Sequence, residues 1–269
     1  MPFFFALKQI PKYKGSKTDF RFCTFTQTLK IKMKHTLLII IATVTLIGCK
    51  NKEELKATKA DALATENTEE AINKENLTTA EAIAYASGLE HWDKVSELKF
   101  TFNVDRGGNI FSRSWQWNPK TDDVTMMTAE DTVAYNRSSL DSISTKADQA
   151  FINDKYWLHA PYNLVWDEGT TITEKKNEIA PMSKDTLNMV TITYNDSLGY
   201  TPGDAYDIYY DSEFMPREWV YRKGNAEEAS MVTSWEDYKT FEGLKFAEMH
   251  KDPSGDFKLF FSDISVKTE

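Results

Sequence analysis

The chain has 269 residues, of which 41% are hydrophobic and 13% aromatic, which suffices for one domain with one packed core. It contains 41 acidic and 32 basic residues and has a formal net charge of −9. An acidic surface repels the phosphate backbone, so the composition argues against a nucleic-acid-binding protein. Both cysteines, Cys23 and Cys49, precede the expected folded domain, which therefore has neither a disulfide nor a thiolate metal site.

A short apolar segment near the N-terminus is typical of a secretory signal peptide. It begins at Thr36 after the basic residue Lys34 and ends just before Cys49. The segment is too short to span roughly 30 Å of hydrocarbon, which argues against a transmembrane helix. We assign residues 33–48 to the signal peptide. Residues 1–32 are interpreted as an extension ahead of the true start or as a lengthened basic leader.

The end of this segment, Leu46-Ile47-Gly48-Cys49, resembles the lipobox of bacterial lipoproteins. The resemblance implies that the Cys49 thiol receives a diacylglycerol and that the signal is cleaved before it. No aspartate follows Cys49, which by the same resemblance favours the outer membrane. Removal of residues 1–48 leaves 24 basic and 40 acidic residues, about −16 in net charge. Such a surface does not lie flat on anionic lipid, so the expected membrane contact is the acyl anchor.

Residues 49–77 are predicted to form a disordered charged tether. They are rich in Lys, Glu, Ala, Thr and Asn and have almost no large apolar residues, so burial cannot offset the loss of chain entropy. Lys52-Glu53-Glu54 resembles the surface-export signal of some Gram-negative lipoproteins, although charged tethers are common. A periplasmic and a surface-exposed location both stay open.

The folded domain is predicted to occupy residues 78–269. It starts with a helix, because Thr78 and Glu81 match a capping box, and Gly88 is expected to bend or end that helix. A second short helical segment is expected around 91–98, with its apolar residues on one face.

A further helix and a series of strands follow. Ser144 is a candidate cap for a helix that Pro161 is expected to stop. Alternating apolar residues separated by turn signals predict hairpins without crossover helices. The domain is therefore expected to be α+β, with a curved antiparallel sheet of about ten strands, an incomplete β-barrel, wrapped over one to three helices. The expected strands lie near residues 100–104, 110–117, 124–126, 133–135, 171–174, 188–194, 204–210, 219–222, 230–238, 245–249 and 257–261.

An N-terminal helix followed by a meander of about ten strands that a helix interrupts is one part of a recognisable pattern. The more telling part is a series of segments in the second half of the domain: Tyr206-Asp207-Ile208-Tyr209-Tyr210-Asp211, Phe214-Met215-Pro216, Trp219-Val220-Tyr221, Trp235-Glu236-Asp237-Tyr238 and Gly243-Leu244-Lys245-Phe246. The whole pattern resembles the lipoprotein-carrier (LolA/LolB-like) superfamily. The resemblance covers roughly residues 80–266, and it implies an open antiparallel barrel over helices with an apolar cavity that shelters acyl chains. No protruding apolar loop of the kind that relatives use for lipoprotein delivery is identified.

Aromatic residues at strand spacing are the candidate ligand-binding residues, because a concave aromatic face suits an acyl chain or a flat ligand. The alternative is that the same side chains fill a core. Arg113 lies among aromatics and is the candidate for gating the cavity, although such an arginine often stacks on a ring or reaches water. The candidates are Phe111, Arg113, Trp115, Trp117, Tyr206, Tyr210, Trp219, Tyr221 and Trp235.

Catalytic and metal-binding patterns are weak. Asp204, Asp207 and Asp211 lie close together in the sequence, but strand alternation predicts a solvated face for them. The histidines lack metal-ligand spacing, and no nucleophile elbow or phosphate loop occurs. We therefore expect neither enzymatic activity nor a metal or cofactor.

These observations predict a lipid-anchored outer-membrane protein that binds a hydrophobic ligand in an apolar cavity, as a lipoprotein-sorting carrier would. Its expected partners are the membrane, through the anchor, and acyl chains or other lipoproteins. Two alternatives stay open. One is a non-catalytic structural or interaction lipoprotein, and the other is a carbohydrate-binding or hydrolytic surface lipoprotein.

Overall fold

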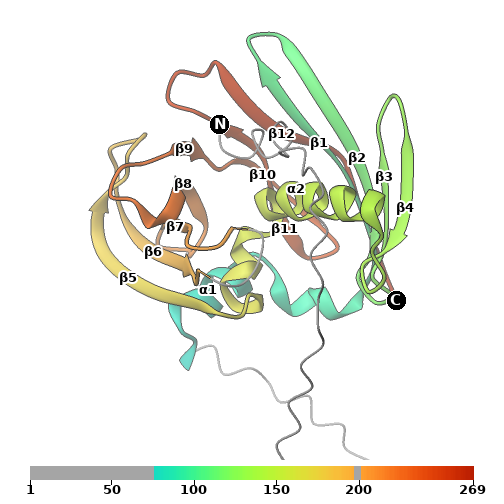
Figure 1. Cartoon of the computed structure of the whole chain (residues 1–269). Helices are drawn as coiled ribbons and strands as arrows, with labels where there is room; N and C mark the ends of the chain where they lie inside the picture. Colours follow the sequence, from blue (N-terminus) through green and yellow to red (C-terminus); the bar gives the residue numbers. More distant parts are fainter. Residues whose placement is uncertain (1–75, 197–200) are drawn as a thin grey trace, which may run out of the picture. The chain divides into compact units, whose positions relative to one another are not determined.

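The computed structural model describes residues 76–196 and 201–269 (Figure 1). The predicted signal peptide, the lipidation site Cys49 and the tether up to residue 75 lie outside the described residues. The predicted α+β class is confirmed: the described residues form twelve strands in two antiparallel sheets that do not close into a barrel. Within the described ranges, the structure contains no helix with the length and apolar character needed to cross a bilayer.

The N-terminal helix α1 (Thr79–Ala86) forms as predicted. Thr78 and Glu81 make the reciprocal hydrogen bonds of a capping box, which satisfies two free backbone amides. Gly88 follows in the left-handed conformation with φ 95°, and it introduces the 3-10 helix η3 (Leu89–Lys94). The predicted second helical segment is too long, because strand pairing with the C-terminal strand already begins at Val95.

A seven-stranded sheet brings the two ends of the domain together. Its order is β10-β11-β12-β1-β2-β3-β4, and the long strands β1 and β12 pair through most of their length. The chain therefore returns at its end to the strand with which the sheet began. The strands are β1 (Val95–Arg106), β2 (Asn109–Asn118), β3 (Asp123–Met127), β4 (Thr132–Asn136), β10 (Glu236–Phe241), β11 (Leu244–Lys251) and β12 (Phe257–Thr268).

The remaining strands form a five-stranded meander in sequence order. Its middle strand β7 is buried along almost its whole length, so both faces of the sheet are covered there. A short 3-10 helix, η4 (Lys223–Asn225), follows the fourth strand of the meander. The strands are β5 (Thr170–Ile179), β6 (Thr186–Tyr194), β7 (Ala205–Tyr210), β8 (Pro216–Arg222) and β9 (Met231–Ser234).

The chain changes from one sheet to the other at Trp235. The sequence predicts one strand over residues 230–238, but the structure has two, β9 in the five-stranded sheet and β10 in the seven-stranded sheet. The indole of Trp235 is buried between Trp219 and His250, at ring-centroid distances of 5.5 and 4.7 Å. Burial of a large side chain from both sheets explains why an apparently continuous strand pattern is divided here.

Helix α2 (Ser142–Trp166) packs against both sheets (Figure 1). Two predictions about it are wrong: Asp141, not Ser144, is its cap, and the helix continues through Pro161. A proline inside a helix costs about 3 kcal/mol, because it removes a backbone hydrogen bond. Burial offsets this cost, since every residue from Trp157 to Leu164 is buried.

Candidate functional site

A cavity of about 380 Å³ lies between α2 and the five-stranded sheet. Aromatic side chains form the apolar part of its wall together with Ile152, and the exposed residues Gln149 and Glu168 stand at its rim. The aromatic lining comes from α2, β6, β7 and β8. It consists of Tyr156, Trp157, Trp166, Tyr194, Tyr206 and Trp219. The polar lining consists of Arg137, Gln149, Asn153, Lys155, Asn163, Asp167, Glu168 and Thr201.

The aromatic wall is held by contacts among its own rings. Trp219 lies 4.5 Å from Trp157 and 5.2 Å from Tyr206, measured between ring centroids. Tyr156 lies 4.9 Å from Tyr206. Tilted ring pairs at these separations add to the stability gained by burial. The wall is therefore formed before any ligand arrives.

At one end of the cavity, Asp167 is the centre of a small network of hydrogen bonds. The hydroxyl of Tyr194 lies 2.6 Å from Oδ2 of Asp167 and 3.0 Å from the hydroxyl of Tyr156. A carboxylate only accepts, so Tyr194 donates to Asp167 and Tyr156 donates to Tyr194. Asn163 donates to the other oxygen, Oδ1, at 2.8 Å. The negative charge of Asp167 is thus already well satisfied.

Burial raises the pKa values of both tyrosines in this chain of hydrogen bonds. The nearby Asp167 carboxylate raises both pKa values as well, because an anionic phenolate beside a carboxylate is unfavourable. Tyr156 and Tyr194 therefore stay protonated and serve as donors.

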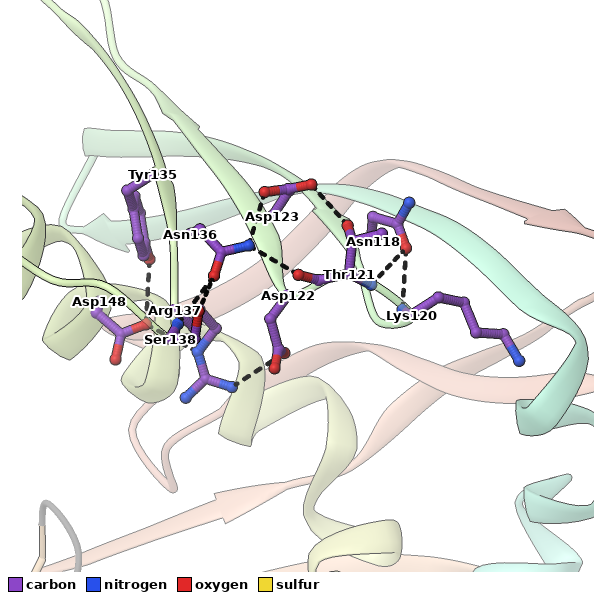
Figure 2. Close-up of polar contacts among 10 residues, drawn as sticks. All are labelled: Asn118, Lys120, Thr121, Asp122, Asp123, Tyr135, Asn136, Arg137, Ser138 and Asp148. Carbon is purple, nitrogen blue, oxygen red and sulfur yellow. Dashed lines mark hydrogen bonds and ion pairs between the residues drawn. The ribbon is translucent and has the colours of Figure 1, made fainter.

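Arg137 joins the cavity to a polar network at the ends of β2, β3 and β4 (Figure 2). Its Nε donates to Oδ1 of Asp148 at 2.9 Å, and its Nη1 lies 4.0 Å from Asp122. Asn136 donates to Thr121 and Asp123, which fixes the turn that carries Asp122. The positive charge of Arg137 is thus compensated within the protein.

Lys155 is the second cation of the wall. Its Nζ lies 5.5 Å from the ring centroid of Trp117 and 5.7 Å from that of Trp166, and only 8% of the residue is exposed. Burial lowers the pKa of Lys155 to about 8, and the nearby Asp167 offsets part of this decrease. The neighbouring His159, one turn along α2, is fully buried, and its pKa is well below the usual value, so it is neutral.

The residues predicted from the sequence divide into four groups, of which three lie on or beside the five-stranded sheet. Tyr206 and Trp219 line the cavity. Tyr221 and Trp235 pack directly behind them, at 5.1 Å from Tyr206 and 5.5 Å from Trp219. Tyr210 stacks instead on Phe214, away from the cavity wall.

The candidates on β2 face a different part of α2. Trp115 and Trp117 pack on Phe151, at 5.3 and 5.5 Å. Arg113 makes a bidentate ion pair with Asp154, at 2.9 and 2.8 Å, and its guanidinium lies 5.0 Å from the ring centroid of Phe111. Arg113 therefore has the geometry expected from the alternative interpretation, that of an arginine stacked on an aromatic ring.

The prediction that Asp204 and Asp207 lie on a solvated face is wrong. Asp207 accepts from Arg222 at 2.8 and 3.0 Å and from the Thr191 hydroxyl at 2.7 Å. Asp204 accepts from the hydroxyl of Tyr221 at 2.7 Å. Both acids are buried, Asp207 on the largely buried strand β7 and Asp204 one residue before it. Their hydrogen bonds indicate a structural role.

The structure adds site residues that sequence reasoning missed, chiefly Tyr156, Trp157 and Lys155 of α2. The aromatic run that begins at Tyr156 could have indicated them. Selection of aromatic residues by strand spacing finds only residues of the sheets. Among the described residues, no group of acids, histidines or cysteines could hold a metal ion.

A second hollow, of about 720 Å³, borders the strands β8 to β10. Its walls carry several charged side chains, some of which are already engaged: Arg217 donates to Asp211, and Glu218 accepts from the backbone amides of Met182 and Ser183. An apolar ligand gains little from such a surface, so the aromatic cavity is the better candidate site.

No protein-family model and no curated protein sequence matches the chain. Solved structures do match it. A LolA superfamily protein from Nitrosomonas europaea matches with a TM-score of 0.42 at 13% identity, over 72% of this chain and 96% of that chain. A DUF1329 family protein from Desulfovibrio piger matches with a TM-score of 0.41 at 8% identity, over 70% and 92%. An outer membrane lipoprotein-sorting protein domain from Vibrio parahaemolyticus matches with a TM-score of 0.40 at 11% identity, over 70% and 94%. The solved structures that match the chain thus include a member of the superfamily that its sequence pattern resembles.

Proposed function

We propose that this protein binds an apolar or amphipathic ligand, such as an acyl chain, in the cavity between α2 and the five-stranded sheet. The observation that carries this proposal is the aromatic cavity of about 380 Å³. Ligand sites in proteins are typically apolar and occupy about 300 to 1,000 Å³. The wall is built from rings that already pack on one another, so binding requires little ordering of side chains.

The proposed function is binding without catalysis. Asp167 lies beside the aromatic residues of the cavity wall and accepts two hydrogen bonds. The two tyrosines beside it stay protonated. Each oxygen of Asp167 already accepts a hydrogen bond and both tyrosines are donors, so this arrangement favours holding a ligand over abstracting a proton from it. A carrier or receptor fits the lining better than an enzyme does.

A carbohydrate-binding surface has less support. Such a surface would present exposed aromatic rings in a row. Among the described residues, the exposed large aromatics are Phe111 and Phe214. Phe111 lies on β2 of the seven-stranded sheet, whereas Phe214 lies between β7 and β8 of the other sheet, so the two do not form a row.

The proposal is tested by measuring whether the protein binds acyl compounds and whether a side chain that fills the cavity weakens this binding. The chain in full, carrying Cys49→Ala so that no lipid is attached, should co-purify with acyl compounds or bind added ones, as seen by native mass spectrometry. Ile152 lines the cavity, so Ile152→Trp should fill it and weaken binding by about 10-fold or more. Ile143→Trp is the matched control, because Ile143 lies on the same helix and is 65% exposed. A protein that never binds acyl compounds, or that binds them equally well with Trp at position 152, would overturn the proposal.

The proposed location is the outer membrane, with a lipid on Cys49 and residues 49–77 as the tether. In a Gram-negative host that is fed labelled palmitate, Cys49→Ala should abolish labelling and release the protein from the membrane fraction. Cys23→Ala is the matched control and should leave both unchanged. Labelling that persists without Cys49 would contradict a lipobox at this position.

A further inference from the structure

Lys155 places an ammonium group inside the aromatic cavity without an acidic partner. The residue is 92% buried and contributes to the cavity wall. Its Nζ lies near the rings of Trp117 and Trp166, which stabilise the charge through cation–π contacts. Ring faces do not accept three hydrogen bonds, and no carboxylate of the described residues lies within 4 Å of Nζ.

The acids that act most strongly on the charge of Lys155 are engaged by other donors, and Glu168, a further acid of the wall, is exposed at the rim. Asp167, at the end of the same helix, is held by Tyr194 and Asn163. Asp148, also on α2, is held by Arg137, which lies near Asp122 as well. His159 on the same helix is neutral, so it neither repels nor neutralises the ammonium. The cavity therefore contains a cation whose hydrogen-bonding capacity is left for a molecule in the cavity.

We propose that Lys155 binds the carboxylate of an amphipathic acid whose apolar chain lies against the aromatic wall. This inference rests on the proposed function and names the chemical class of its ligand. A single ammonium matches a monoanionic head group, whereas a phosphate dianion calls for several cationic or N–H donors. The other cation of the wall, Arg137, is already paired. A fatty acid or a similar carboxylic acid thus fits the lining better than a neutral lipid or a phosphate monoester.

Decanoate and 1-decanol separate the head group from the chain. We expect the full chain carrying Cys49→Ala to bind decanoate more tightly than 1-decanol in isothermal titration calorimetry at pH 7. Lys155→Met removes the charge and keeps an apolar side chain of similar length. It should weaken decanoate binding by about 10- to 100-fold and leave 1-decanol binding within about twofold. Lys146→Met, at an exposed position of the same helix, should change neither affinity.

The pH dependence gives a second readout. The carboxyl group of decanoate is ionised throughout the neutral and alkaline range. A change in its affinity over this range therefore reflects a change in the protonation of the protein. The pKa of Lys155 is about 8 in the free protein, and a bound carboxylate would raise it. Decanoate affinity should therefore be constant below pH 8 and fall above it, while the Lys155→Met protein shows no such fall.

The outcomes distinguish this inference from the function on which it rests. Equal binding of decanoate and 1-decanol, or decanoate binding that is unaffected by Lys155→Met, would overturn the role of Lys155 and leave the apolar cavity intact. Failure of both ligands to bind the unsubstituted protein would overturn the proposed function itself. Preference for decyl phosphate over decanoate would overturn the carboxylate assignment.

Discussion

Replacement of Arg113 by methionine should lower the free energy of unfolding by about 3 to 5 kcal/mol, measured by urea denaturation at pH 7. The variant leaves the carboxylate of Asp154 in the interior without its ion-pair partner. Asp154 is fully buried, and Arg113 contacts it through two hydrogen bonds of 2.9 and 2.8 Å. Trp115 and Asn153 also donate to this carboxylate, but neither carries a charge.

The effect should depend on pH in a defined direction. Burial raises the pKa of Asp154, and the Arg113 guanidinium limits this rise. Because the folded-state pKa is above the unfolded value, protonation favours the folded state, and this benefit is lost as pH rises through the folded-state pKa. Without Arg113 the pKa rises further. The destabilisation should therefore be largest near pH 7 and should shrink as the pH is lowered towards 4.

Two further variants test whether the buried charge is the cause. Arg217→Met removes an ion pair with Asp211, but Arg217 is about half exposed, so the cost should be at most about 1 kcal/mol. The double substitution Arg113→Met with Asp154→Leu removes both charges and should recover most of the lost stability. If the double variant is no more stable than Arg113→Met, lost packing on Phe111 and not an uncompensated charge is the cause.

The hairpins and the first helix were predictable because their signals are local. The capping box of Thr78 and the turn glycine Gly88 act within a few residues, and strand alternation reports which face is buried. The passage of α2 through Pro161 and the change of sheet at Trp235 depend on contacts with distant elements. No short pattern in the sequence contains that information.

The candidate site was only half predictable for the same reason. Alternation on β7 and β8 identified Tyr206 and Trp219, which do line the cavity. The opposite wall comes from a helix whose C-terminal part, Trp157 to Leu164, is buried on all sides, so its apolar residues show no clean helical stripe. Lys155 is harder still, because lysines are mostly exposed and only the packed structure reveals a buried one.

Replacement of Gly88 by alanine should lower the free energy of unfolding by about 3 to 4 kcal/mol in the same denaturation assay. Gly88 has φ 95°, a conformation that costs a residue with a Cβ atom about 1 to 2 kcal/mol. In addition, a Cβ atom would overlap the carbonyl oxygen of Gly243 and lie 3.0 Å from its carbonyl carbon. These are backbone atoms, so no side-chain rotation relieves the contact.

The backbone around Gly88 has little freedom to move away, because the carbonyl oxygen of Ser87 accepts from the amide of Lys245 at 2.8 Å and from the Tyr162 hydroxyl at 2.7 Å. Gly107→Ala is the matched control, because Gly107 also has a positive φ, 60°, but no atom lies within 4 Å of the position that its Cβ atom would take. Gly107→Ala should lower the free energy of unfolding by only about 1 to 2 kcal/mol, because it introduces backbone strain without a steric overlap. Equal losses at both positions would show that the close approach of Gly88 to Gly243 is not what joins α1 to β11. A much larger loss at Gly88 would show that this contact fixes the helix against the sheet.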